Sequence, residues 1–202
     1  MSARQWLEFL LPEALTMQFD WIRNLVQGDR NLVARISRSP TAQRLLNRET
    51  YKLHQVVVPD RASLEPHQQW LLWSHDRQRL LARQLGVSAL HGFIRTTIDA
   101  RLVASFRQQL GDEGYKRALT APALQVEGLD RAPLVQVVQQ GRLAEHVAGV
   151  GAALLEISAP DDSFCRLRMR FVFSPACWNA RPRDIRVDEA DLAAHIQSVA
   201  GV

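Results

Sequence analysis

The chain has 202 residues and a mass of 22.9 kDa, enough for one domain with a sizeable core. Its hydrophobic fraction of 47% and charged fraction of 23% are ordinary for a soluble globular protein, and no run of about 18 apolar residues predicts a membrane span. The formal charge of +4 is spread along the chain rather than gathered in one run, so composition alone supports nucleic-acid binding only weakly.

The N-terminus does not have the pattern of a signal peptide, because the apolar run over residues 7–11 contains Glu8 and stops at Pro12. We therefore expect a cytoplasmic protein. Cys165 and Cys177 match no zinc-binding spacing, and two cysteines in a cytosolic chain are typical of free, buried thiols.

The first predicted elements are helical. A helix is expected over residues 12–28, with apolar positions that recur on one face: Leu15, Phe19, Ile22 and Val26. A short second helix is expected from Pro40 through Leu46. Three valines before Pro59 favour an extended segment, so residues 52–66 are the predicted linker or loop.

Two further helices are predicted from Pro66 to the region of Asp99. Pro66 fits the first turn of a helix that ends at Gly86, and its expected buried side consists of Trp70, Trp73, Leu80, Leu81 and Leu85. Ser88 is the expected cap of the next helix. The apolar side of that helix is expected to consist of Leu90, Phe93, Ile94 and Ile98.

The clearest amphipathic segment follows Asp99, which is expected to cap it, and Gly111 is expected to end it. Its predicted buried face consists of Leu102, Val103, Phe106 and Leu110. Asp112 then opens a short turn that carries Tyr115, Ala118 and Leu119.

The last part of the chain contains three predicted helices and one predicted strand or hairpin after a loop at residues 121–130. Helices are expected over residues 130–140, after Gly141 and over residues 188–199. In the helix after Gly141, small residues would let a neighbouring helix approach closely: Ala148, Gly151 and Ala152. Residues 164–173 alternate between apolar and basic side chains, the period of a short strand or hairpin.

The predicted fold class is therefore mainly α, in a single compact multi-helix domain over residues 1–202. Within it we expect an N-terminal helical part over about 1–60, a main helical core over about 66–160 and a C-terminal extension over about 161–202.

No catalytic, metal-binding or cofactor-binding residues are predicted. The chain has no GxSxG elbow, GxxxxGK[ST] loop or GxGxxG motif. His67 and His75 are eight residues apart, too far for a metal-binding pair on one helix face. His146 adjoins Glu145, and neighbours on a helix are expected to point apart.

The concentrated basic feature is formed by Arg166, Arg168 and Arg170. On a strand these side chains would share one face, with Leu167, Met169 and Phe171 on the other. Three interpretations remain: a solvated face, a docking surface for an acidic protein partner, and a strip that binds nucleic acid. The sequence-based candidates for partner binding are these three arginines.

The order of elements in residues 80–119 resembles the SctK family, the YscK/OrgA-type accessory proteins of the type III secretion sorting platform. The residues that carry the resemblance are Leu85–Gly86, Ile98–Asp99, Phe106, Leu110, Gly111, Tyr115, Ala118 and Leu119. The segment Arg166–Phe171, after the Leu154–Leu155 helix, also looks like the closing segment of that family. The resemblance covers roughly residues 66–173.

The resemblance implies a non-enzymatic cytoplasmic adaptor without a cofactor. Its partners would be the cytoplasmic domain of the inner-membrane ring protein and the pod or C-ring-like protein of the sorting platform, and no nucleic acid or direct membrane insertion is expected. The alternative class is a helical nucleic-acid-binding regulator, and an enzyme of unknown type comes third.

Overall fold

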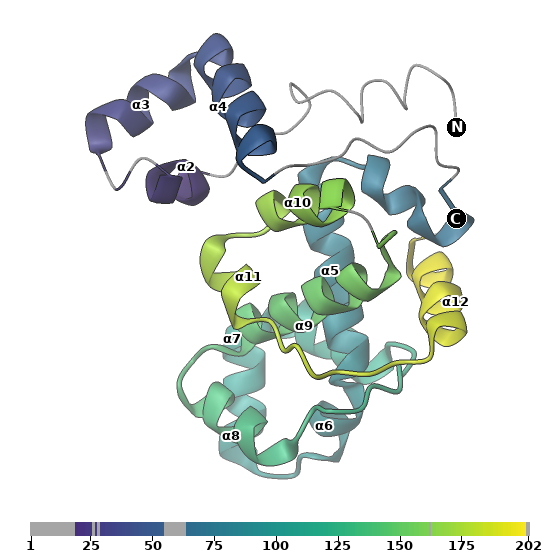
Figure 1. The fold of residues 1–202 in the computed structure, drawn as a ribbon. Helices are drawn as coiled ribbons and strands as arrows, with labels where there is room; N and C mark the ends of the chain where they lie inside the picture. The colour runs from purple at the N-terminus through teal and green to yellow at the C-terminus, as the bar shows by residue number, and fades with distance from the viewer. Residues whose placement is uncertain (1–18, 26, 28, 55–63, 162, 201–202) are drawn as a thin grey trace. The chain divides into compact units, whose positions relative to one another are not determined.

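The computed structural model describes residues 19–25, 27, 29–54, 64–161 and 163–200 (Figure 1). These residues form helices and no strand, with one isolated bridge between Glu127 and Arg186, so the predicted mainly α fold is confirmed. The chain divides into two compact units, residues 1–75 with 159–176 and residues 76–158 with 177–202. Residues 161–176 of the expected C-terminal extension thus belong to the first unit.

Among the described residues of the first unit there are three consecutive α-helices, a 3-10 helix and a later α-helix. These are α2 (Phe19–Leu25), α3 (Arg30–Arg38), α4 (Pro40–Leu53), η2 (Pro66–Leu72) and α10 (Ser163–Val172). The predicted positions Leu15, Val26 and Gly28, and most of the predicted linker (residues 55–63), lie outside the described residues.

Side-chain caps fix the corner between α3 and α4. Asp29 accepts hydrogen bonds from the backbone amides of Asn31 and Leu32, at 2.9 and 3.0 Å, and so begins α3. Ser39 ends α3 and begins α4, where its hydroxyl accepts from the Ala42 amide at 3.2 Å. Pro40 follows at the first helical position, where its missing N–H costs nothing. The helix predicted there is real and runs on to Leu53.

The described residues of the second unit form a further set of α-helices. They are α5 (His75–Ala89), α6 (His91–Thr96), α7 (Ala100–Thr120), α8 (Arg131–Gln139), α9 (Leu143–Ser158) and α12 (Glu189–Ala200). The short helix α11 (Pro175–Ala180) spans the boundary between the two units.

Phe106 on α7 occupies the centre of the apolar core in this unit. Its side chain is fully buried, with the Phe93 ring 5.7 Å away in an edge contact and the Tyr115 ring stacked at 6.4 Å. The other buried members of the core come from α5 to α9: Val87, Leu90, Ile94, Ala118, Leu134, Val138, Leu143 and Val147. The predicted positions Leu102, Val103 and Leu110 pack against this core and are partly buried.

Two glycines play different parts in these helices. Gly111 has a φ of +74°, which breaks the helical path within α7, as predicted. Gly86 was predicted to end a helix, and this is wrong: it is buried inside α5. Its role is to let α9 approach, because a Cβ at this position would stand 2.0 Å from the Val147 carbonyl oxygen. Local sequence does not reveal such a partner.

Several helix boundaries also differ from the predictions. The helix expected from Pro66 to Leu85 is split into η2 and α5, and Ser88 lies inside α5 rather than capping α6. Asp99 caps α7 as predicted, accepting from the amides of Arg101 and Leu102 at 2.8 and 3.3 Å. The residues Leu80 and Ile98, expected to be buried, are 50% and 97% exposed.

Candidate functional site

The segment that carries Arg166, Arg168 and Arg170 is the helix α10, so the strand or hairpin predicted at residues 164–173 is wrong. The apolar residues of α10 are buried on more than one side: Phe164, Cys165, Leu167, Met169, Phe171 and Val172. This arrangement includes an alternating series, which is why the sequence suggested a strand. Burial of the whole set favours the helix, since a strand would expose Phe164 and Val172 on its basic side.

Arg166 is the most accessible of the three candidate arginines. Its side chain is 58% exposed and forms an ion pair with Asp161, a residue that precedes the helix. Exposed ion pairs of this kind contribute at most about 1 kcal/mol, so Arg166 remains available to a partner.

Arg168 is half-buried and lies on the opposite side of α10. Its guanidinium lies over the Phe164 ring, 5.6 Å from the ring centre, and beside the Tyr51 hydroxyl of α4. Burial lowers the pKa of this guanidinium below its usual value, and Tyr51 works in the opposite direction. Arg168 therefore serves the packing of α10 against α4, where the Tyr51 and Phe164 rings also meet at 5.9 Å.

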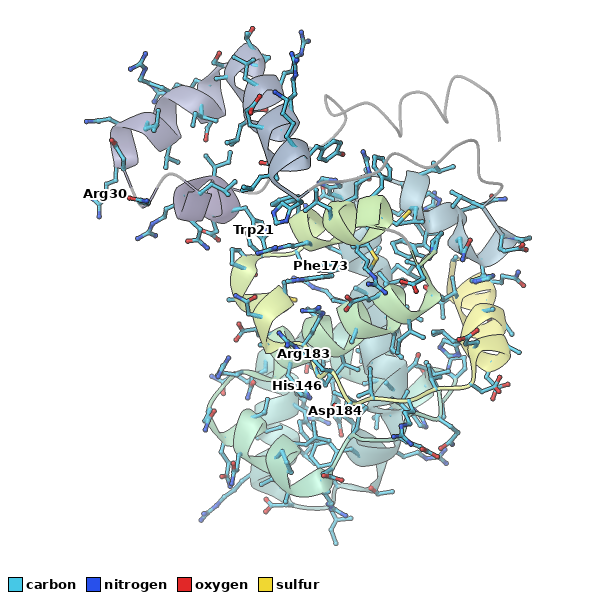
Figure 2. All side chains as sticks on the ribbon, viewed as in Figure 1. Trp21, Arg30, His146, Phe173, Arg183 and Asp184 are labelled. Atoms are coloured by element: carbon cyan, nitrogen blue, oxygen red, sulfur yellow. The ribbon has the colours of Figure 1, made fainter. Side chains whose placement is uncertain are left out.

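Arg170 is engaged by an aromatic residue of α2. Its guanidinium lies 4.7 Å from the centre of the Trp21 ring, a cation–π distance. Trp21 donates a hydrogen bond of 2.6 Å to the Phe173 carbonyl and makes an edge contact of 5.4 Å with Phe171 (Figure 2). These contacts attach α2 to the end of α10.

The three arginines thus do not share a face. Arg166 and Arg170 are four residues apart and lie on one side of the helix, while Arg168 lies on the other. Two of the three stack on aromatic rings within the first unit, and Arg166 is the one directed to solvent. The sequence-based prediction named the three arginines but assigned them to a strand, whereas they lie on the helix α10.

A second candidate lies in the second unit, where residues of α8, α9 and α11 surround a cavity of about 150 Å³. Its lining includes Val137, Arg142, Glu145, His146 and Ala180. The expectation that Glu145 and His146 point apart missed this cavity, because both residues border it. Figure 2 marks His146 in this unit.

The titratable groups of this cavity are held in their neutral or paired forms. Burial, with a smaller contribution from Arg142, lowers the pKa of His146, so its imidazole is uncharged at neutral pH. The Nε2 atom of His146 is buried and has no hydrogen-bond partner among the described residues. Arg142 and Glu145 form an ion pair at 3.1 Å.

Both cysteines are free and buried, as predicted. Burial and the nearby Glu145 carboxylate raise the pKa of Cys177 to about 11, against the opposing effects of Arg83 and Arg181. The thiolate is the reactive form, so a thiol with this pKa is a poor nucleophile at neutral pH. The surroundings of Cys177 thus suit a packed core thiol.

No pattern in the sequence indicates the polar cluster around Arg181. Its guanidinium forms two hydrogen bonds to Glu156 of α9, at 2.7 and 3.2 Å, and lies 3.9 Å from the centre of the Trp178 ring. A third hydrogen bond of 2.6 Å reaches the Trp178 carbonyl. The exposed fractions of the Arg181 and Glu156 side chains are 13% and 28%, so the pair is largely shielded from water. It attaches the end of α11 to α9.

A metal-binding cluster and a membrane-spanning helix are both absent from the described part of the chain. Among these residues no group of three or more histidine, cysteine, aspartate or glutamate side chains is placed to hold a metal ion. None of the described helices combines the length and the hydropathy needed to cross a membrane.

Comparisons with protein-family models, with curated proteins and with solved structures each found no match to this chain.

Proposed function

We propose that this chain is a non-enzymatic cytoplasmic adaptor of a bacterial type III secretion sorting platform. It would link the cytoplasmic domain of the inner-membrane ring protein to the pod or C-ring-like protein, and so act at the inner membrane beside the secretion apparatus. The proposal rests on the resemblance to the SctK family and on the structural parts played by the residues that carry it.

The observation that best supports the proposal is that several of these residues, though not the exposed Ile98, build the second unit. Gly86 allows α5 and α9 to approach closely, Asp99 caps α7, and Gly111 breaks the path of that helix. Phe106, Tyr115 and Ala118 are buried in its core. In this chain these residues support a helical scaffold, as an adaptor requires.

The resemblance also covers Arg166–Phe171 in the first unit. Arg166 is the exposed candidate for partner binding on α10, and Arg168 and Arg170 support the helix that presents it. An acidic surface on either platform protein would complement Arg166. We therefore keep these three arginines as the proposed partner-binding segment, with Arg166 as the contacting residue.

Binding to the two named partners tests the proposal. The purified chain should bind the cytoplasmic domain of the ring protein, the pod protein, or both, saturably in calorimetry, and deletion of its gene should abolish secretion of type III substrates. If neither partner binds and the purified chain carries nucleic acid with salt-sensitive affinity, the regulator is favoured instead.

A further inference from the structure

The helix α4 presents two parallel rows of side chains that the functions above do not use. Its basic row consists of Arg44, Arg48 and Lys52, each four residues after the last, and all three are exposed. Residues four apart lie above one another on a helix, about 6 Å apart along its axis. The row is therefore a continuous cationic ridge.

The second row runs beside the first and is mostly apolar. It consists of Leu45, Glu49 and Leu53, again at intervals of four, and the two leucines are 56% and 73% exposed. Glu49 lies between them and is bound to Lys52 at 2.8 Å, which lowers the pKa of its carboxyl. The opposite side of α4 is buried through Asn47, Thr50 and Tyr51, so these rows form its free face.

Basic side chains outnumber acidic ones in the part of the chain around these rows. In residues 19–54 the acidic side chains are Asp20, Asp29 and Glu49, whereas the basic ones are Arg23, Arg30, Arg35, Arg38, Arg44, Arg48 and Lys52. Asp29 is occupied as the cap of α3 and Glu49 is paired with Lys52. Neither Arg44 nor Arg48 has an ion pair within the described residues.

The neighbouring helix α3 is also basic. Its exposed arginines are Arg30, Arg35 and Arg38, while Val33 and Ile36 form its buried side. Figure 2 shows the Arg30 side chain at the first turn of this helix. A concentrated positive potential of this kind speeds the approach of an acidic partner.

We propose that the free face of α4 is a docking surface for an acidic amphipathic helix of another protein. Ridges of side chains at intervals of four on one helix pack into the matching grooves of a second helix. A partner helix with glutamates or aspartates along one such ridge would pair with the basic row, since arginine binds carboxylates bidentately. Apolar residues on its adjacent ridge would cover Leu45 and Leu53.

Two other anionic partners fit this face less well. A lipid surface would have to receive the ridge of Leu45 and Leu53 together with the Glu49–Lys52 pair between them, and removing that pair from water is unfavourable. A nucleic acid would use the basic row but would leave the two leucines in water. A protein helix satisfies both rows, which is why we choose it.

The inference stands on the rows of α4 alone and does not require the secretion role, so its test uses no platform protein. The probe is a synthetic helical peptide with glutamates at every fourth position beside a row of leucines, and the readout is fluorescence anisotropy with the full chain. We expect saturable binding at physiological ionic strength. The variant Arg44→Glu/Arg48→Glu should weaken it at least about tenfold.

The matched control is Arg101→Glu/Arg117→Glu, which changes the net charge equally at two exposed arginines of α7. It should bind within about twofold of the wild type, since it leaves both rows of α4 unchanged. Leu45→Gln/Leu53→Gln should also weaken binding, because the apolar row loses its contact. Melting curves of all three variants should match the wild type, since every changed side chain is exposed.

Three results would overturn the proposal. The first is no saturable binding of the peptide to the wild-type chain. The second is equal loss of binding in the α4 and α7 charge variants, which would show a general charge effect. The third is that phosphatidylglycerol vesicles or duplex DNA bind more tightly than the peptide, and that this binding depends on Arg44 and Arg48. That result would make the face a surface for anionic lipid or nucleic acid.

Discussion

Gly86 of α5 lies directly against Val147 of α9, so closely that a Cβ on Gly86 would stand 2.0 Å from the Val147 carbonyl oxygen. The same crossing is repeated one turn along, where a Cβ on Gly151 would stand 1.7 Å from the Ala82 carbonyl oxygen. Each helix thus places a glycine opposite the backbone of the other. Such short separations exclude any side chain at either position unless the helices move apart.

We predict that Gly86→Ala and Gly151→Ala each destabilise the protein by at least about 3 kcal/mol, because separating α5 and α9 also loosens the core around them. The measurement is the free energy of unfolding in urea. The matched control is Gly92→Ala in α6, where a Cβ would meet nothing within 4 Å. That variant should gain about 0.5–1 kcal/mol from helix propensity. A wild-type value for Gly86→Ala would contradict the close crossing.

The fully buried Phe106 gives the second prediction. Phe106→Ala should cost about 3–5 kcal/mol, because it leaves a cavity between the Phe93 and Tyr115 rings. The control is Leu119→Ala on the same helix, whose side chain is 38% exposed and should cost much less. Equal losses in the two variants would show that α7 is packed by a different face.

The parts of the fold that could be predicted from the sequence are those that depend on local chemistry. Asp99 was identified as a cap because its carboxylate reaches the next amides, and Gly111 as a break because few other residues accept its φ of +74°. Phe106 was identified from helical spacing. The small residue Gly151 was also correctly expected to admit a neighbouring helix.

What could not be predicted depends on segments far away in the chain. Gly86 was interpreted as a stop because nothing near it in sequence shows that α9 approaches there. For Arg168 and Arg170 the sequence favours a solvated face, a docking surface or a nucleic-acid strip, because their aromatic neighbours Trp21 and Tyr51 come from α2 and α4. The cavity beside His146 likewise depends on α8 and α11, which are separate in sequence.

Gln109 of α7 provides a third prediction. Its side-chain amide donates to the Val138 carbonyl at 2.8 Å and accepts from the Leu143 amide at 2.7 Å, so it spans the turn between α8 and α9. Gln109→Ala leaves both backbone groups without this partner and should cost about 1–3 kcal/mol. The exposed neighbour Gln108→Ala is the control and should cost under about 0.5 kcal/mol. Hydrogen exchange of the Leu143 amide should quicken only in the first variant.

Two histidines of the second unit, His146 and His195, predict how the stability of the protein depends on pH. Burial lowers the pKa of His146 and of His195 in the folded chain from the ordinary value of 6.5. Below pH 6.5 the two histidines bind protons in the unfolded chain but not in the folded chain. The free energy of unfolding therefore decreases as the pH falls through 6.5. It stops decreasing once the pH is below the pKa values of the folded chain. Unfolding in urea at a series of pH values should show this loss. In His146→Gln/His195→Gln the dependence should be flatter, and an unchanged slope would contradict the assignment.

The last prediction separates the two sides of α10. Arg168→Glu puts a carboxylate over the face of the Phe164 ring in a half-buried place, so it should lower stability by about 2 kcal/mol or more. Arg166→Glu breaks an exposed ion pair with Asp161 and should change stability by less than about 1 kcal/mol. Thermal melting measures both.

Because Arg166→Glu preserves the fold, it is the variant that tests partner binding. Weaker binding to a platform protein with an unchanged melting curve would support α10 as the contact. Unchanged binding would make Arg166 a solvated residue, and a wild-type melting curve for Arg168→Glu would contradict its structural role.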